Sequence, residues 1–191
     1  MWASQLKRPP SCGDSFSAAA FRKRNREGAQ FFMNVHELID QLASAIAQAG
    51  HVIQPISDAP WIPELESRLP KRLPASFRSL VTRYAFPPLQ VGELSLFGNM
   101  GTDDVDEMSN AIFKDRIIAE GTMRAGYIQF ARPATGNYDP ICFDARRPVT
   151  NREFPIVRID HEELLCNDRI RVSETFAKSF YQFASGVLTH A

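Results

Sequence analysis

The chain has 191 residues, of which 44% are hydrophobic and 23% are charged, and its formal net charge is zero. These values are ordinary for a globular protein of one domain, and they exclude a mostly disordered chain, a collagen and a disulfide-rich scaffold. No run of about 18 apolar residues occurs, so no transmembrane helix is expected. The balanced charge gives no electrostatic reason to expect nucleic acid or membrane as partners. The cysteines number three, and an odd count fits a reducing cytoplasm better than a disulfide framework.

The charge is unevenly distributed along the chain. Residues 1–33 contain six Lys or Arg and two Asp or Glu, whereas residues 34–191 contain sixteen basic and twenty acidic residues. The first segment is also rich in Ser, Ala and Pro and has no sustained apolar period, so we expect a flexible basic tail. An uninformative extension is the simpler interpretation, with targeting or nucleic-acid binding as the alternative. Met33, just before the first periodic segment, offers a translation start downstream of the assigned one.

Helices are predicted before any strand. Residues 34–49 carry apolar side chains at helical spacing, with Asn34 as the N-cap and Gly50 as the stop. After a linker with two prolines, helices are expected at 61–69 and 75–85, the second of them stopped by consecutive prolines. We therefore divide the chain into a basic tail (1–33), an N-terminal helix with its linker (34–59) and a main domain (60–191).

The apolar period then changes to one that is typical of strands. Strands are expected at 91–97, 127–131, 141–144 and 154–160. A helix is expected at 103–120, between the first two. The loops that join the later strands are too short for a crossover helix, so neighbouring strands should pair antiparallel as a meander.

The C-terminal segment is predicted to be a helix. Ser173 is its expected N-cap. The apolar face of this helix consists of Phe176, Phe180, Phe183 and Val187. The predicted fold class is therefore α+β, an antiparallel meander sheet with helices at the N- and C-terminal ends packed against it.

Few residues form a pattern with catalytic meaning. Cys142 and His161 are a Cys–His pair that could supply a thiolate nucleophile and its base, but Cys142 lies in an apolar strand. A small apolar thiol in the core is the simpler interpretation. Residues 160–163, Asp-His-Glu-Glu, offer ligand atoms, but Leu165 replaces the second His of the helical zinc motif. We therefore expect a strand-end cap there, and we predict no catalytic residue, no metal, no cofactor and no small-molecule substrate.

The densest cluster of charges in the predicted domain is acidic and lies at the start of the helix expected at 103–120. Acidic residues in the first turn stabilise a helix through its macrodipole, which is the structural explanation. The functional alternative is a docking patch for a basic protein. The predicted partner-binding residues are Asp103, Asp104, Asp106, Glu107, Tyr138 and Asp139.

Several segments together resemble the SUKH superfamily, which includes a yeast regulator of cell-wall synthesis and many bacterial immunity proteins. The segments are 73–81 (LPASFRSLV), 91–97 (VGELSLF), 137–144 (NYDPICFD), 154–162 (FPIVRIDHE) and the Ser-Phe start of the last helix at 179–183. They occur in the family's order and span about residues 60–188. One departure is residues 84–88, where many members carry Asn-Gly-Gly, and this departure places the chain in a divergent bacterial branch.

The resemblance implies an α+β binding fold without catalytic residues, whose common role is to neutralise a toxin inside the producing or sibling cell. The leading hypothesis is a non-catalytic, cytoplasmic protein-binding module of the immunity type. Many bacterial toxins are nucleases with basic surfaces, so a basic toxin domain is the expected partner. A regulatory or scaffold protein of the same fold without a toxin partner is one alternative. A Cys–His hydrolase or transferase is the other.

Overall fold

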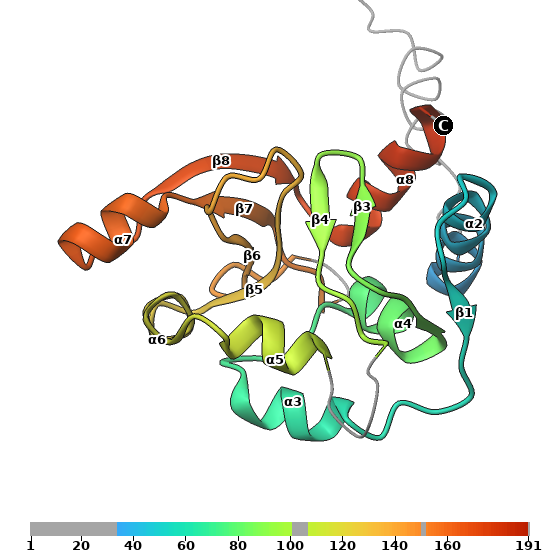
Figure 1. The fold of residues 1–191 in the computed structure, drawn as a ribbon, viewed down its shortest axis with the longest axis horizontal. Coiled ribbons are helices and arrows are strands. Elements are labelled where there is room, and N and C mark those ends of the chain that lie inside the picture. Colours follow the sequence, from blue (N-terminus) through green and yellow to red (C-terminus); the bar gives the residue numbers. More distant parts are fainter. Residues whose placement is uncertain (1–33, 101–106, 150–151, 191) are drawn as a thin grey trace, which may run out of the picture. The chain divides into compact units, whose positions relative to one another are not determined.

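The computed structural model describes residues 34–100, 107–149 and 152–190, which belong to one compact unit, Asn34–Ala191. An antiparallel sheet of six strands lies at its centre, with the strands side by side in chain order (Figure 1). The strands are β3 (Leu89–Val91), β4 (Leu94–Leu96), β5 (Tyr127–Pro133), β6 (Ile141–Asp144), β7 (Ile156–Ile159) and β8 (Val172–Ala177). Every neighbouring pair is antiparallel, which confirms the predicted meander.

Helices from both ends of the described chain pack together beside the sheet. The helices are α2 (Val35–Gln48), α3 (Ile62–Arg68), α4 (Ala75–Arg83), α5 (Glu107–Phe113), α6 (Arg116–Arg124), α7 (His161–Asn167) and α8 (Phe180–His190). Helix α2 contacts both α4 and α8, as the neighbouring ribbons in Figure 1 show. This arrangement confirms the predicted α+β class. Within the described residues, no helix combines the length and the apolar composition that crossing a bilayer requires.

Helix α2 follows from its sequence pattern. Leu38, Ile39 and Leu42 are fully buried on one face. The side chain of Asn34 accepts a hydrogen bond from the amide of His36 at 3.1 Å and so caps the helix. Gly50 follows its C-terminus with a φ of 86°, a left-handed conformation that glycine adopts without strain.

An aromatic cluster fills the space between the sheet and the helices α4 and α8. It consists of Phe77 of α4, Phe130 of β5, Phe143 of β6 and Phe180 of α8, all without solvent exposure. The ring centroid of Phe77 lies 5.1 to 5.2 Å from those of the other three. Each such pair adds about 0.5–1.5 kcal/mol beyond the burial of its area, so this cluster is a main source of stability.

The opposite face of the sheet carries a second apolar cluster. Its buried members are Tyr127, Cys142, Val157 and Ile159. Ala125 at the end of α6 and Ile170 after α7 pack against it. Helices α6 and α7 approach each other closely, because a Cβ atom at Gly121 would lie 2.7 Å from Leu164 Cδ1. A side chain at position 121 would therefore require the side chain of Leu164 to shift.

Two predicted elements are divided in the structure. Residues 91–97 were expected to form one strand, but Gly92, with a φ of 57°, reverses the chain between β3 and β4. The helix expected at 103–120 is replaced over its described part by α5 and α6. The side chain of Asp115 causes this break, because it accepts a hydrogen bond from the amide of Ile118 at 3.2 Å and starts a new helix. Residues 101–106, the expected start, lie outside the described residues.

The prediction that Ser173 caps the last helix is wrong. Ser173 and Phe176 belong to β8, an edge strand that pairs with β7. The last helix begins later, at Phe180, where the hydroxyl of Ser179 accepts a hydrogen bond from the amide of Gln182 at 3.0 Å. Serine is a good N-cap at either position, but Ser173 lies in a segment that pairs with β7, so Ser179 caps the helix instead.

The helix predicted at 75–85 ends at Arg83. Its last two expected residues form β2 (Tyr84–Ala85), which pairs with β1 (Gln54–Pro55) in a small second sheet. The side chain of Asn99 stabilises the backbone at the end of α4. It accepts from the amide of Phe86 at 2.9 Å and donates to two carbonyls at the end of α4, at 3.0 and 2.8 Å. A buried side chain from a distant loop thus ends the helix before the prolines do.

Candidate functional site

Half of the predicted partner-binding residues can be placed. Asp103, Asp104 and Asp106 lie outside the described part of the chain. Glu107 is the first described residue of α5 and is exposed. It borders a shallow depression of about 470 Å³, whose other lining residues come from α5 and from the segments next to β3 and β4.

Tyr138 lies in the connection between β5 and β6 and is 45% exposed. Its hydroxyl donates a hydrogen bond to Asp115 at 2.9 Å, and the guanidinium carbon of Arg132 lies 3.9 Å from the centre of its ring. The ring of His161 meets it edge-on, with the centroids 5.8 Å apart. These contacts hold the tyrosine ring in one orientation at the surface, next to the first turn of α6.

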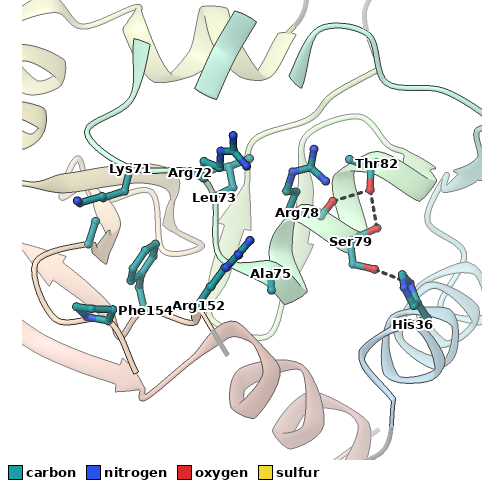
Figure 2. A pocket seen from close by; sticks show the side chains of 12 residues that line it. His36, Lys71, Arg72, Leu73, Ala75, Arg78, Ser79, Thr82, Arg152 and Phe154 are labelled. Atoms are coloured by element: carbon teal, nitrogen blue, oxygen red, sulfur yellow. Dashed lines mark hydrogen bonds between the residues drawn. The ribbon is translucent and has the colours of Figure 1, made fainter. Parts of the chain in front are cut away.

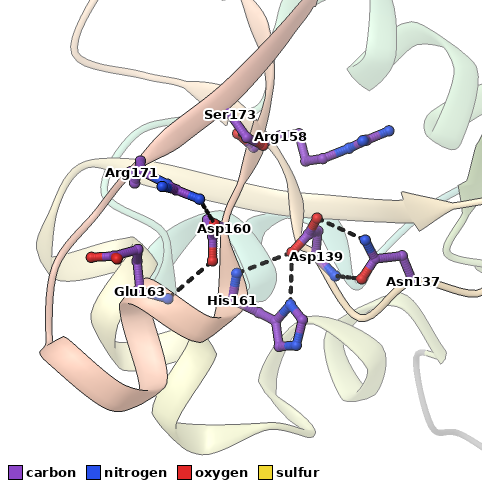
Figure 3. A network of polar contacts seen from close by, with 8 residues as sticks. All are labelled: Asn137, Asp139, Arg158, Asp160, His161, Glu163, Arg171 and Ser173. Carbon is purple, nitrogen blue, oxygen red and sulfur yellow. Dashed lines mark hydrogen bonds and ion pairs between the residues drawn. The ribbon is translucent and has the colours of Figure 1, made fainter.

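Asp139, the next residue, has a different environment. It is only 8% exposed. One carboxylate oxygen accepts from the amide of His161 at 3.1 Å and from Nδ1 of the same residue at 2.7 Å, and the other accepts from the Asn137 side chain at 3.0 Å (Figure 3). Both oxygens are therefore engaged within the chain, and they fix the start of α7 against the loop before β6.

Asp160 caps helix α7, which the sequence pattern had not predicted. Its carboxylate accepts a hydrogen bond from the amide of Glu163 at 3.0 Å and also binds the guanidinium of Arg171 (Figure 3). The amide of Glu163 and the charge of Arg171 hold the pKa of Asp160 below its ordinary value. The expected cap at the strand end is present, and a helix of seven residues follows it. The Asp-x-x-Glu spacing of a helix start was the signal for α7.

The contacts of Cys142 and His161 argue against a nucleophile and base. Cys142 lies in β6 opposite Gln129 and Val157, with no solvent exposure. Burial, and to a lesser extent the charge of Asp144, raises the pKa of its thiol well above the ordinary value, so the thiol stays protonated. Nδ1 of His161 is engaged by Asp139 instead. Among the residues that the structure covers, no group of three His, Cys, Asp or Glu side chains is arranged to hold a metal ion.

The structure forms a groove of about 720 Å³ that the sequence pattern did not suggest. It lies between the α3–α4 connection, helix α4 and the β6–β7 connection (Figure 2). We call it the basic groove, because the described residues that line it include Lys71, Arg72, Arg78, Arg152 and His36, but no Asp or Glu. Only the Lys71-Arg72 pair is visible as a basic feature in the sequence, since the other cations come from separate segments.

The cations of the basic groove differ in their partners. Arg78 forms an ion pair with Glu66, with Nε and Oε1 3.2 Å apart. Lys71, Arg72 and Arg152 are exposed, and none of them has an ion-pair partner among the described side chains. The groove therefore presents three cations that no other described side chain neutralises by an ion pair.

The chain was compared with models of known protein families. A comparison with protein-family models matches residues 58–185 to the SMI1 / KNR4 family (SUKH-1). The chain belongs to the SUKH superfamily. A search of curated proteins found no match. The SUKH match begins before α3 and ends within α8, so α2 precedes the matched region although it packs against α4 and α8.

The structure also explains the segments that resemble other SUKH proteins. In this SUKH protein, the Leu-Pro segment places Leu73 in the groove, 3% exposed, immediately before α4. The Asp-His-Glu segment at 160–162 forms the cap and first turn of α7. The divergent segment at 84–88 contains β2 and is held by Asn99. The Leu-Pro and Asp-His-Glu segments are therefore accounted for by structural roles.

Proposed function

We propose that this SUKH protein is a non-catalytic module that binds a protein toxin in the cytoplasm and neutralises it. The family match over residues 58–185 carries the proposal, because the resemblance to SUKH immunity proteins implies action by binding. The burial of Cys142 supports the non-catalytic part. Its thiol is protonated and closed to solvent, so it is poorly suited to attack a substrate.

A protein that neutralises a toxin by binding must cover the toxin's active surface, and this needs complementary shape and charge. Tyr138 supports a docking role near the start of α6, because its ring is exposed and held in place by three neighbours. Asp139 contributes indirectly, by fixing His161 against that ring. Glu107 and the acidic residues before it remain the proposed charges for a basic toxin domain.

The proposal is tested by finding the partner and measuring what it does alone. The full chain, carrying an affinity tag, is crosslinked in its own cells, and the proteins bound to it are identified by mass spectrometry. The partner is then expressed in a susceptible host with and without the chain. We expect growth arrest with the partner alone and recovery of growth when the chain is present.

Two other results would contradict this proposal. A partner that binds the chain but does not arrest growth when expressed alone would favour the regulatory or scaffold alternative. Recovery of growth that is lost in the Cys142→Ala variant, with unchanged binding and melting temperature, would indicate that the thiol acts chemically.

A further inference from the structure

We infer that the basic groove binds an acidic segment of a protein partner. The groove lies between the α3–α4 connection, α4 and the β6–β7 connection, and the charged side chains among its described lining residues are all basic (Figure 2). The inference rests on the proposed protein-binding role, since it takes the occupant to be a polypeptide, but it does not require the partner to be a toxin.

Three acidic side chains near the groove are already engaged, with Ser76, Arg78 or Arg146, so they do not neutralise Lys71, Arg72 or Arg152. Glu153 is 6% exposed, and its two oxygens accept from the amide and the hydroxyl of Ser76, each at 2.8 Å. Glu66 is bound to Arg78 and also accepts from the amide of Leu73 at 3.2 Å. Asp144 is paired with Arg146 at 2.8 Å. Within the part of the chain that the structure describes, the charges of Lys71, Arg72 and Arg152 thus remain for an external anion.

The floor of the groove is apolar. Leu73, Ala145 and Phe154 line it and are each less than a tenth exposed. A ligand that fits both the floor and the cationic rim needs carboxylates together with apolar side chains. An acidic polypeptide segment has this combination, and its carboxylates match the planar, forked geometry of arginine.

Nucleic acid fits the same surface less well. The N-terminus of α4, where backbone amides would receive a phosphate, is already occupied by the carboxylate of Glu153. Residues 34–191 carry a formal net charge of −4, so this part of the chain as a whole does not attract a long polyanion. A short acidic segment is less affected, because its charge is local to the groove.

The groove is tested with a defined probe, a fluorescein-labelled peptide of Glu-Glu-Leu repeats, whose binding to the full chain is followed by fluorescence anisotropy at low salt. The double variant Lys71→Glu/Arg72→Glu should weaken binding about tenfold, because two attractive charges become repulsive. The matched control is Arg169→Glu/Lys178→Glu, which makes the same change in net charge at exposed residues outside the groove. This control should bind within about twofold of the parent chain.

A neutral variant and a second probe complete the test. Lys71→Gln/Arg72→Gln should lose an intermediate amount of affinity and guards against misfolding of the charge-reversed chain. Equal weakening in the groove and control variants, or no binding of the peptide to the parent chain, would overturn the inference. A single-stranded oligonucleotide of equal charge that binds more tightly, and depends on the same two residues, would assign the groove to nucleic acid instead. The growth experiment can fail while this one succeeds, so the two proposals are tested separately.

Discussion

Two charged regions of the domain differ in how far their side chains are paired within the chain. In the network around Asp139 and Asp160, both carboxylates accept two or more hydrogen bonds from other residues of the chain. In the basic groove, Lys71, Arg72 and Arg152 have no ion-pair partner among the described residues. The charges of the first region are paired within the chain, whereas three cations of the second region have no ion-pair partner among the described residues.

This difference shows why a dense run of charges in a sequence is a weak sign of a binding site. The run Asp-His-Glu-Glu at 160–163 suggested ligand atoms, yet Asp160 and His161 are used to begin α7. The groove was not noticeable in the sequence, because its cations lie on segments that meet only in the folded chain. Unpaired charges of one sign repel each other, and folding alone does not favour such an arrangement.

The largest effect is expected from breaking the network at Asp139. Asp139→Ala should lower the free energy of unfolding by about 2–3 kcal/mol, because the partly buried amide and Nδ1 of His161 both lose their acceptor. Urea denaturation measures the change. Asp139→Asn keeps an acceptor and should cost less. If Asp139→Ala unfolds at the same urea concentration as the parent chain, the network does not stabilise the domain.

Acidification should weaken the network in a predictable direction. The amide of Glu163 and the charge of Arg171 lower the pKa of Asp160 from its ordinary value of 3.8. A carboxyl group with a lowered pKa stabilises the folded state above its unfolded-state pKa, and this stabilisation is lost as the pH falls through the folded-state pKa. Asp160→Asn should therefore be less stable than the parent chain at pH 7, with a difference that shrinks below about pH 4. A difference that is independent of pH would contradict the assignment.

A smaller effect is expected from removing the buried thiol. Cys142→Ala should lower the free energy of unfolding by about 1 kcal/mol, because it leaves a small cavity in the second apolar cluster. Partner binding and any protective effect on growth should be unchanged. A loss of function at unchanged melting temperature would show that the thiol has a chemical role.

The acidic residues before and at the start of α5 provide a test of the proposed toxin contact. Reversing Asp103, Asp104 and Glu107 to Lys should slow association with a basic partner and weaken its salt dependence, with little change in unfolding. Stopped-flow association at low and high salt measures both. An unchanged association rate at low salt would mean that these acidic residues do not contact the partner.

The smallest change in stability is expected in the groove. Lys71→Ala/Arg72→Ala should alter the free energy of unfolding by no more than about 0.5 kcal/mol, because both side chains are exposed and unpaired among the described residues. The same urea experiment measures it alongside Asp139→Ala. A loss as large as that of Asp139→Ala would mean that the two cations are structural, and the contrast between the regions would disappear.

Much of the fold could be predicted because its determinants are local. The spacing of Leu38, Ile39 and Leu42 specifies the buried face of α2, and Asn34 and Gly50 mark its ends. The strand at 141–144 was predicted with its observed bounds. Short connections between successive strands require antiparallel pairing, so the meander followed without knowledge of tertiary contacts.

The elements that were predicted incorrectly depend on contacts between distant segments. Ser173 is a good helix cap and Phe176 continues the apolar spacing of the last helix, but residues 172–177 pair with β7 as a strand instead. Asn99, which follows β4, stabilises the end of α4 with its side chain, and the residues of α4 do not indicate this contact. Intrinsic helix and strand preferences differ by less than the energy of such tertiary contacts, so the contacts decide.

Patterns within short segments were enough to predict the α+β class, the antiparallel pairing of successive strands and the family resemblance. Which cations lack an ion-pair partner among the described residues depends instead on contacts between distant segments. Lys71 and Arg72 precede α4 while Arg152 follows β6, and the groove exists because the sheet brings these connections together. The packed domain likewise decides whether an acidic side chain, such as Glu153 or Asp139, accepts hydrogen bonds within the chain.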